Sequence, residues 1–268
     1  MITKLIATDL DGTFWNDEKG FNEEKFDQLL QRLDDNDGHF VVSTGNDRAT
    51  VDRVMTKFIG SFDYVVNNGA QIITKDNQTV ALHQIGHDLS SQIYQIILAM
   101  DVELEHGVVF ATGHAGYMMA NERGVGRLAH IMEEEFPELQ SIDAVTDISE
   151  EILKIILRVP ENLSNAVIDR LQETIGDLAH VTTSGYGAID IVPANTNKAA
   201  GLATLAEYYA LPLSELVAFG DGRNDLEMLR VATVGYAMPN GDRMLLNMFE
   251  AAVADNNHDG VLDTLLKS

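Results

Sequence analysis

The sequence predicts an α/β fold, with a Rossmann-like parallel-sheet core into which an α/β (α+β) domain is inserted. Short apolar runs alternate with helix-like segments over residues 2–66. A hairpin-like pattern interrupts this alternation near residue 72, and the alternation resumes at residues 188–192. We therefore expect a core of residues 1–81 and 188–268 and an inserted domain of residues 82–187, both within the usual range of domain sizes.

The first part of the chain begins with a strand, because residues 2–8 form the apolar run typical of a buried parallel strand. The helix that follows has Asn22 as its predicted N-cap. Its buried face is formed by four apolar residues at helical spacing: Phe26, Leu29, Leu30 and Leu33. Two further strands and the helix between them complete this part: residues 40–43, 64–66 and 48–58.

The middle of the chain mixes strands and helices. Residues 72–74 and 79–82 flank four polar residues and predict a hairpin. Further helices are predicted around residues 93–100, 130–136 and 163–174, and strands around residues 108–110, 117–120 and 152–159. After residue 188 the pattern predicts strands at residues 188–192, 216–219, 234–238 and 252–254, with helices at residues 198–210 and 224–231.

Composition excludes several classes of function. The chain has 268 residues with 18 basic and 42 acidic side chains, a formal charge of −24, which opposes binding to nucleic acid. It has no cysteine, so any metal is held by oxygen or imidazole. No apolar run is long enough to cross a bilayer, and the N-terminus has no signal-peptide pattern, so we expect a cytoplasmic protein without membrane contact.

Acidic residues follow two of the predicted strands. The first strand ends at Asp9-Leu10-Asp11-Gly12-Thr13, and the strand at residues 216–219 ends at Gly220-Asp221-Gly222-Arg223-Asn224-Asp225. Ligands collect at the carboxyl ends of parallel strands, and carboxylates this close together call for a cation. Taken singly, each cluster can also be an acidic turn or a helix N-cap, but two of them in one chain favour a metal site.

Two weaker signals suggest a site for phosphate. Thr44 and Gly45 follow the strand at residues 40–43, where a hydroxyl and a backbone amide can donate hydrogen bonds to a phosphoryl oxygen. Lys198 starts a predicted helix and is the only lysine between Lys154 and Lys267. Each also has an ordinary interpretation, as a helix cap and as a solvated side chain.

Together these segments resemble the haloacid-dehalogenase superfamily, and within it the Cof-type phosphatase branch. The resemblance covers nearly the whole chain, and the insertion lies where that branch carries its α/β cap domain. Its matching segments are residues 9–13, Thr44-Gly45, Asn68-Gly69-Ala70, Lys198, residues 220–225, residues 237–241 and residues 256–261.

The resemblance implies a mechanism and a set of roles. Asp9 would attack phosphorus and form an aspartyl-phosphate, and Asp11 would protonate the leaving alkoxide and later activate water. Mg2+ would be held by three groups: a carboxylate oxygen of Asp9, the main-chain carbonyl of Asp11 and a carboxylate oxygen of Asp221. The phosphate-binding group would comprise Thr44, Gly45, Lys198 and Asn224. Asp225, together with Asn224, would anchor bound water or Lys198 without contacting the cation directly.

Positions 46 and 223 depart from the pattern of the family, and Pro239 is also unusual in its segment. Asn46 stands where relatives often carry an arginine, with Arg48 two residues further on, and Arg223 stands where they usually carry an acidic residue. The first departure leaves a substrate contact open. The second is unusual beside a cation site unless the side chain faces outward.

Three interpretations of function follow from the resemblance. The first is a Mg2+-dependent phosphatase acting on small phosphate monoesters, such as sugar phosphates or phosphorylated cofactors, with a small sugar phosphate as the first candidate. The second is a phosphotransferase of the phosphomutase type. The third is a non-catalytic protein that senses a phosphorylated metabolite. The sequence does not indicate an oligomeric state.

Overall fold

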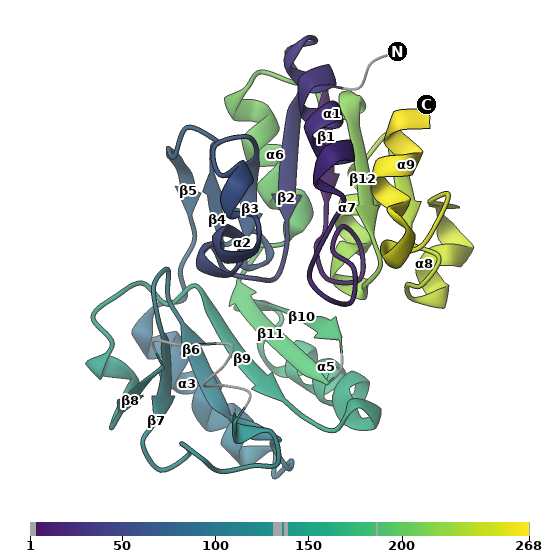
Figure 1. The fold of residues 1–268 in the computed structure, drawn as a ribbon. Helices are drawn as coiled ribbons and strands as arrows, with labels where there is room; N and C mark the ends of the chain where they lie inside the picture. The colour runs from purple at the N-terminus through teal and green to yellow at the C-terminus, as the bar shows by residue number, and fades with distance from the viewer. Residues whose placement is uncertain (1–3, 131–135, 137–138, 186, 268) are drawn as a thin grey trace. The chain divides into compact units, whose positions relative to one another are not determined.

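The computed structural model describes residues 4–130, 136, 139–185 and 187–267. The chain divides into two compact units, one formed by Met1–Leu82 with Asn197–Ser268 and the other by His83–Thr196. Each unit has its own sheet (Figure 1), and each has its own apolar core. This confirms the predicted α/β class, with a parallel-sheet core and a second sheet.

The first unit is built on an eight-stranded sheet with the order β14-β13-β12-β1-β2-β3-β4-β5. The strands from β14 to β3 pair in parallel, whereas β4 and β5 add an antiparallel hairpin at one edge. The strand bounds are β1 Leu5–Thr8, β2 His39–Ser43, β3 Asp63–Val66, β4 Gln71–Ile73, β5 Thr79–Leu82, β12 Leu216–Gly220, β13 Val234–Ala237 and β14 Glu250–Ala251. The helix bounds are α1 Glu23–Asp34, α2 Arg48–Val54, α6 Lys198–Tyr208, α7 Leu226–Val231, α8 Arg243–Met248 and α9 Gly260–Lys267.

Both faces of this sheet are buried at its central strands β1, β3 and β12, as a parallel sheet with apolar strands requires. Alternate residues of β1 show the division, because Ile6 packs with α1, α2 and α9 while Leu5 and Ala7 pack with α6, α7 and α8. The two helical layers therefore fix the strands from both sides, and the loops after the strands start from a rigid frame.

The predicted first helix forms as α1, for the expected local reasons. The Asn22 side chain accepts a hydrogen bond from the backbone N–H of Lys25, which caps the helix. Three of the four apolar residues of the predicted face are fully buried, and the fourth is half-buried: Phe26, Leu29 and Leu33, and then Leu30. The helix predicted over residues 48–58 is shorter, since α2 ends at Val54 and a 3-10 turn follows at Thr56–Phe58.

The second unit is a six-stranded sheet with the order β10-β11-β9-β6-β7-β8, antiparallel except for the pair β7 and β8. The strand bounds are β6 His106–Ala111, β7 Gly116–Met119, β8 Gln140–Ile142, β9 Lys154–Arg158, β10 Ala179–Gly185 and β11 Ala188–Pro193. Two helices, α3 His87–Ala99 and α5 Glu161–Ile175, pack on one face and enclose its main core. The helix expected near residues 130–136 lies largely outside the described residues.

The strand at residues 188–192 does not return the chain to the parallel sheet, as the sequence-based boundary at residue 188 supposed. It is β11, and it pairs antiparallel with β9 and β10 in the second sheet. The strand–helix pattern of the sequence could not distinguish the two sheets, because β11 is followed by α6 whichever sheet holds the strand. The chain enters the first unit at Asn197 instead. Likewise, the strand predicted at residues 252–254 is displaced to the short β14, Glu250–Ala251.

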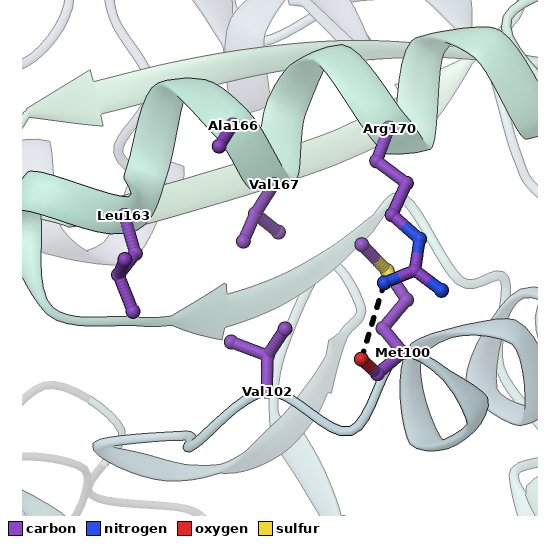
Figure 2. Close-up of a pocket in the computed structure, with 6 residues that line it drawn as sticks. All are labelled: Met100, Val102, Leu163, Ala166, Val167 and Arg170. Carbon is purple, nitrogen blue, oxygen red and sulfur yellow. Dashed lines mark hydrogen bonds between the residues drawn. The ribbon is translucent and has the colours of Figure 1, made fainter.

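One surface pocket lies wholly within the second unit, between α5 and the end of α3 (Figure 2). Six residues line it: Met100, Val102, Leu163, Ala166, Val167 and Arg170. Arg170 donates a hydrogen bond to the Met100 carbonyl, so the one charged group of the lining is already occupied by backbone. These six residues include no carboxylate and no nucleophile. Among the helices of the described residues, none has the length and apolar character needed to cross a bilayer.

Candidate active site

Three neighbouring strands of the first sheet each end at a predicted site residue. Asp9 follows β1, Asp221 follows β12 and Thr44 follows β2, and β1 lies between the other two with parallel pairing on both sides. The backbone N–H of Asp9 continues the pairing by donating to the Phe219 carbonyl at 3.0 Å. Because carboxyl ends of parallel strands share one edge of the sheet, the topology brings together residues more than 200 positions apart.

Lys198 is the centre of a buried ion-pair network. Its Nζ donates to Asp9 Oδ1 at 2.7 Å and to Asp225 Oδ1 at 2.6 Å, and its side chain is 0% exposed. The Asn197 side chain caps α6 by accepting from the Ala200 N–H, which fixes Lys198 as the first residue of the helix. The isolated lysine of the sequence is thus a fully buried cation between two carboxylates.

The two oxygens of Asp225 are both engaged. Oδ1 accepts from Lys198, and Oδ2 accepts from the backbone N–H groups of Asp221 and Gly222 at 3.0 Å each. Asp225 is therefore arranged to hold the lysine and the turn after β12. By contrast, Asp9 Oδ2 and Asp221 Oδ2 receive no hydrogen bond from the described residues, and Asp221 Oδ1 accepts from the Thr13 hydroxyl at 2.8 Å.

The network carries more negative than positive charge. Burial raises the pKa of Asp9 well above its usual value, and the neighbouring Asp225 and Asp221 carboxylates add to this while Lys198 opposes it. Burial and the Asp225 carboxylate likewise raise the pKa of Asp221 to about 6. Burial alone would lower the pKa of Lys198, but Asp225 and Asp9 outweigh it and hold the pKa above its usual value.

The donor set fits a hard divalent cation. Carboxylate oxygens of Asp9, Asp221 and Asp225 lie within 4.8 Å of one another, and no sulfur or imidazole joins them among the described residues. Oxygen-only ligands of this kind are those of Mg2+ and Ca2+. A cation would also offset the charge that raises the pKa values of Asp9 and Asp221. Since both oxygens of Asp225 are occupied, Asp9 and Asp221 are the members that can still bind a cation.

Two glycines permit this close approach. Gly12 has a φ of +73°, and a Cβ at this position would lie 2.6 Å from Asp221 Oδ2. Gly69, with a φ of +91°, lies so close to the Asn197 carbonyl that a Cβ would be 2.2 Å from its oxygen. The first glycine lets the loop after β1 pass beside Asp221, and the second lets the loop after β3 contact the start of α6.

The predicted phosphate-binding residues lie on adjacent loops of the first unit. Thr44 is buried, and its hydroxyl accepts a hydrogen bond from the Asn46 backbone N–H at 3.2 Å. Asn224 donates to the side-chain oxygen of Asn68 at 3.3 Å, and the Asn68 N–H donates in turn to the Thr44 carbonyl at 3.0 Å. Gly45 continues this loop after Thr44. Asn68 belongs to one of the segments that resemble the family, but no role was predicted for it. The signal available was the Asn-Asn-Gly run after a strand, which is typical of a tight turn.

Asp11 differs from the other acids in its surroundings. Its carboxylate is outside the group formed by Asp9, Asp221 and Asp225, and its side chain is 52% exposed. The Asn46 side-chain amide donates to Asp11 Oδ2 at 2.6 Å. Sequence reasoning did not foresee this contact, because position 46 was noted only as a departure from the arginine of the family.

The second departure has a simple structural explanation. Arg223 pairs with Asp242, with 2.9 Å between Nε and Oδ2, and its side chain is half exposed. Asp242 caps α8 through the Met244 N–H and also donates its own N–H to the Asp221 carbonyl at 2.8 Å. Arg223 therefore tethers the helix cap beside the acidic turn.

Comparisons with known proteins give a family match over nearly the whole chain. The chain matches the haloacid dehalogenase-like hydrolase family over residues 6–265. It is 28% identical over 267 residues to the 5-amino-6-(5-phospho-D-ribitylamino)uracil phosphatase YbjI of Escherichia coli (strain K12), covering 100% of this chain and 96% of that protein. It is 28% identical over 262 residues to the phosphatase of the same description, YitU, of Bacillus subtilis (strain 168), covering 96% and 94%.

A solved structure extends the likeness to the fold. The crystal structure of SMU.1108c from Streptococcus mutans UA159 matches with a TM-score of 0.88 at 28% identity, covering 98% of each chain. These relatives indicate an enzyme of the phosphoric monoester hydrolase class. With a family match that spans nearly all its residues, the chain belongs to the haloacid dehalogenase-like hydrolases.

Proposed function

We propose that this protein is a Mg2+-dependent phosphatase that hydrolyses small phosphate monoesters through an aspartyl-phosphate on Asp9. The observation that carries the proposal is the state of the Asp9 carboxylate. One of its oxygens is held by Lys198 at 2.7 Å, and the other receives no hydrogen bond from the described residues. A buried carboxylate that is oriented at one oxygen and open at the other is suited to attack phosphorus.

The reaction has two steps, and Asp11 transfers the proton in each of them. In the first, an Asp9 oxygen bonds to phosphorus as the bond to the alcohol oxygen breaks, and Asp11 gives its proton to the leaving alkoxide. In the second, the Asp11 carboxylate takes a proton from water as the water oxygen attacks phosphorus. The Asp9–phosphorus bond breaks, and inorganic phosphate leaves.

Charge stabilisation is divided between the chain and the cation. Asp9 Oδ1, which accepts one hydrogen bond from Lys198 and has a second lone pair, would hold Mg2+ together with the Asp11 carbonyl and Asp221, and this leaves Oδ2 for the attack. When bound, the cation neutralises charge on the transferring phosphoryl group. Lys198, the Thr44 hydroxyl and the Gly45 N–H would hold the phosphoryl oxygens, where the charge of the transition state is spread. Asp225 would orient Lys198 through their hydrogen bond, and Asn224 would hold the loop of Asn68 in the same way.

For the substrate we propose a phosphate ester of a primary alcohol on a polyol or sugar chain. The two curated relatives described above are phosphatases for a 5-phospho-D-ribitylamino compound, which has such an ester. A 5-phospho-D-ribitylamino compound of this kind is therefore the first to test, followed by sugar phosphates.

The test is phosphate release from p-nitrophenyl phosphate and from a panel of phosphate esters, with Mg2+ and after chelation. We expect turnover with Mg2+, loss of turnover with the chelator and recovery when Mg2+ is returned. The Asp9→Asn variant should lose turnover by about 1,000-fold or more, because it removes the nucleophile, while it keeps the fold. Wild-type turnover by Asp9→Asn would contradict the covalent mechanism.

The same assay separates the proposal from its alternatives. A phosphomutase would move the phosphoryl group between two hydroxyls of a sugar phosphate without releasing phosphate. A protein that only senses a phosphorylated metabolite would bind esters and turn none over. Release of inorganic phosphate from several esters would exclude both.

A further inference from the structure

The Asp11 carboxylate has one short contact that orients it. Asn46 Nδ2 donates to Oδ2 at 2.6 Å. The other charged neighbour, Lys19, has its Nζ 3.9 Å from Oδ1, and its side chain is 59% exposed. Exposed ion pairs at such a distance restrain a side chain little, whereas a hydrogen bond to a carboxylate fixes its direction.

Asn46 is itself fixed on the loop after β2. Its backbone N–H donates to the Thr44 hydroxyl at 3.2 Å, and its carbonyl accepts from the Asn67 N–H at 2.9 Å. Its side-chain Nδ2 also lies 3.3 Å from the Thr44 hydroxyl oxygen. The amide therefore bridges the loop after β2, which carries Thr44, to the loop after β1, which carries Asp11.

We infer that Asn46 is a positioning residue that aims the Asp11 carboxyl group at the leaving oxygen of the ester. The inference rests on the proposed function, since Asp11 acts as an acid only if a phosphoryl group is transferred. An amide N–H at Oδ2 leaves Oδ1 as the oxygen that carries the proton. The proton then passes from Oδ1 to the alkoxide as the phosphorus–oxygen bond breaks.

A leaving-group comparison distinguishes aiming the acid from general support of the site. The p-nitrophenolate leaving group is weakly basic and needs little protonation, whereas an alkoxide is strongly basic and needs it fully. The value of kcat/KM covers the steps up to departure of the alcohol, so it reports the acid role without the later attack of water.

The experiment compares kcat/KM for p-nitrophenyl phosphate and for an alkyl phosphate such as glycerol phosphate, with Mg2+ present. For Asn46→Ala we expect a loss of about 10- to 100-fold on the alkyl ester and of less than about 3-fold on p-nitrophenyl phosphate. Asn46→Gln keeps the amide on a longer side chain and should recover part of the loss on the alkyl ester. It also serves as the second variant if Asn46→Ala does not fold.

A matched control is available on the surface of the same unit. Asn257 donates through Nδ2 to Asp17 Oδ2 at 3.1 Å, which is also a contact between an asparagine amide and an aspartate. Asn257→Ala should leave both kcat/KM values unchanged. Equal losses of Asn46→Ala on the two esters, or no loss on either, would overturn the inference while the proposed function stands. If the wild-type protein hydrolyses neither ester nor any other of the panel, the proposed function fails, and the inference fails with it.

Discussion

Replacing Asp221 by asparagine should stabilise the metal-free protein at neutral pH and abolish its Mg2+-dependent turnover. Burial and the Asp225 carboxylate raise the pKa of Asp221 from its ordinary value of 3.8 to about 6. A rise of this size costs the folded protein about 3 kcal/mol when Asp221 is charged. Asparagine removes this cost and keeps an oxygen that can accept from the Thr13 hydroxyl, whose present bond to Asp221 is 2.8 Å long.

The effect depends on pH with a defined sign. Because the pKa is higher in the folded state than in the unfolded one, the wild-type protein is favoured at low pH. It loses that stability as the pH rises through about 4 to 6. The gain of Asp221→Asn should therefore be about 1 kcal/mol at pH 4.5 and about 3 kcal/mol at pH 7.5. For a unit of this size the larger value corresponds to a rise in Tm of about 6–12 °C.

Thermal unfolding of both proteins at the two pH values, with a chelator and then with Mg2+, measures this directly. Mg2+ should raise the Tm of the wild-type protein at pH 7.5 and have little effect on the variant. Asp242→Asn is the control, because the Met244 N–H and Arg223 hold the pKa of Asp242 below its usual value rather than above it. This variant should not be more stable than the wild-type protein. Equal Tm values for chelated wild type and Asp221→Asn at pH 7.5 would refute the account of the charge at this site.

Two further substitutions test the parts around the acids. Lys198→Met should lower turnover by about 100-fold or more and destabilise the metal-free protein by about 3–5 kcal/mol, because it leaves two buried carboxylates without their cation. Steady-state kinetics and thermal unfolding measure the two effects, and an unchanged Tm would contradict the prediction. Gly12→Ala should weaken Mg2+ activation by about 10-fold, because the new Cβ would lie 2.6 Å from Asp221 Oδ2. The control is Gly124→Ala, which is also at positive φ but has no atom within 4 Å of the new Cβ, and it should leave Mg2+ activation unchanged. Equal Mg2+ dependence of the two alanine variants would contradict the steric argument.

The sequence could predict the acidic pair because its signals are local. Asp9 and Asp221 each follow a short, mostly apolar run, and such runs in an α/β pattern become parallel strands. That the two strands are neighbours follows from packing, and the structure pairs Thr8 with Phe219 in β1 and β12. Lys198 could be suspected from its isolation, and the family resemblance offered Asp225 as a partner, but its hydrogen bond to Asp9 was not predicted.

Other features depend on contacts that no local pattern encodes. The strand at residues 188–192 is apolar enough for either sheet, and only its pairing with β9 and β10 assigns it to the second one. The contact between Asn46 and Asp11 depends on how two loops approach each other, and its residues lie 35 positions apart. Such side-chain contacts become visible only when the strands that carry the loops have been ordered.

The measurement that tests the central claim most directly is the location of the phosphoryl group during turnover. Rapid acid quenching of the wild-type protein with Mg2+ and substrate, followed by peptide mass spectrometry, should find a phosphorylated aspartate at Asp9. The Asp9→Asn variant should yield no phosphopeptide under the same conditions. Phosphate on another residue, or turnover that continues in Asp9→Asn, would contradict the account.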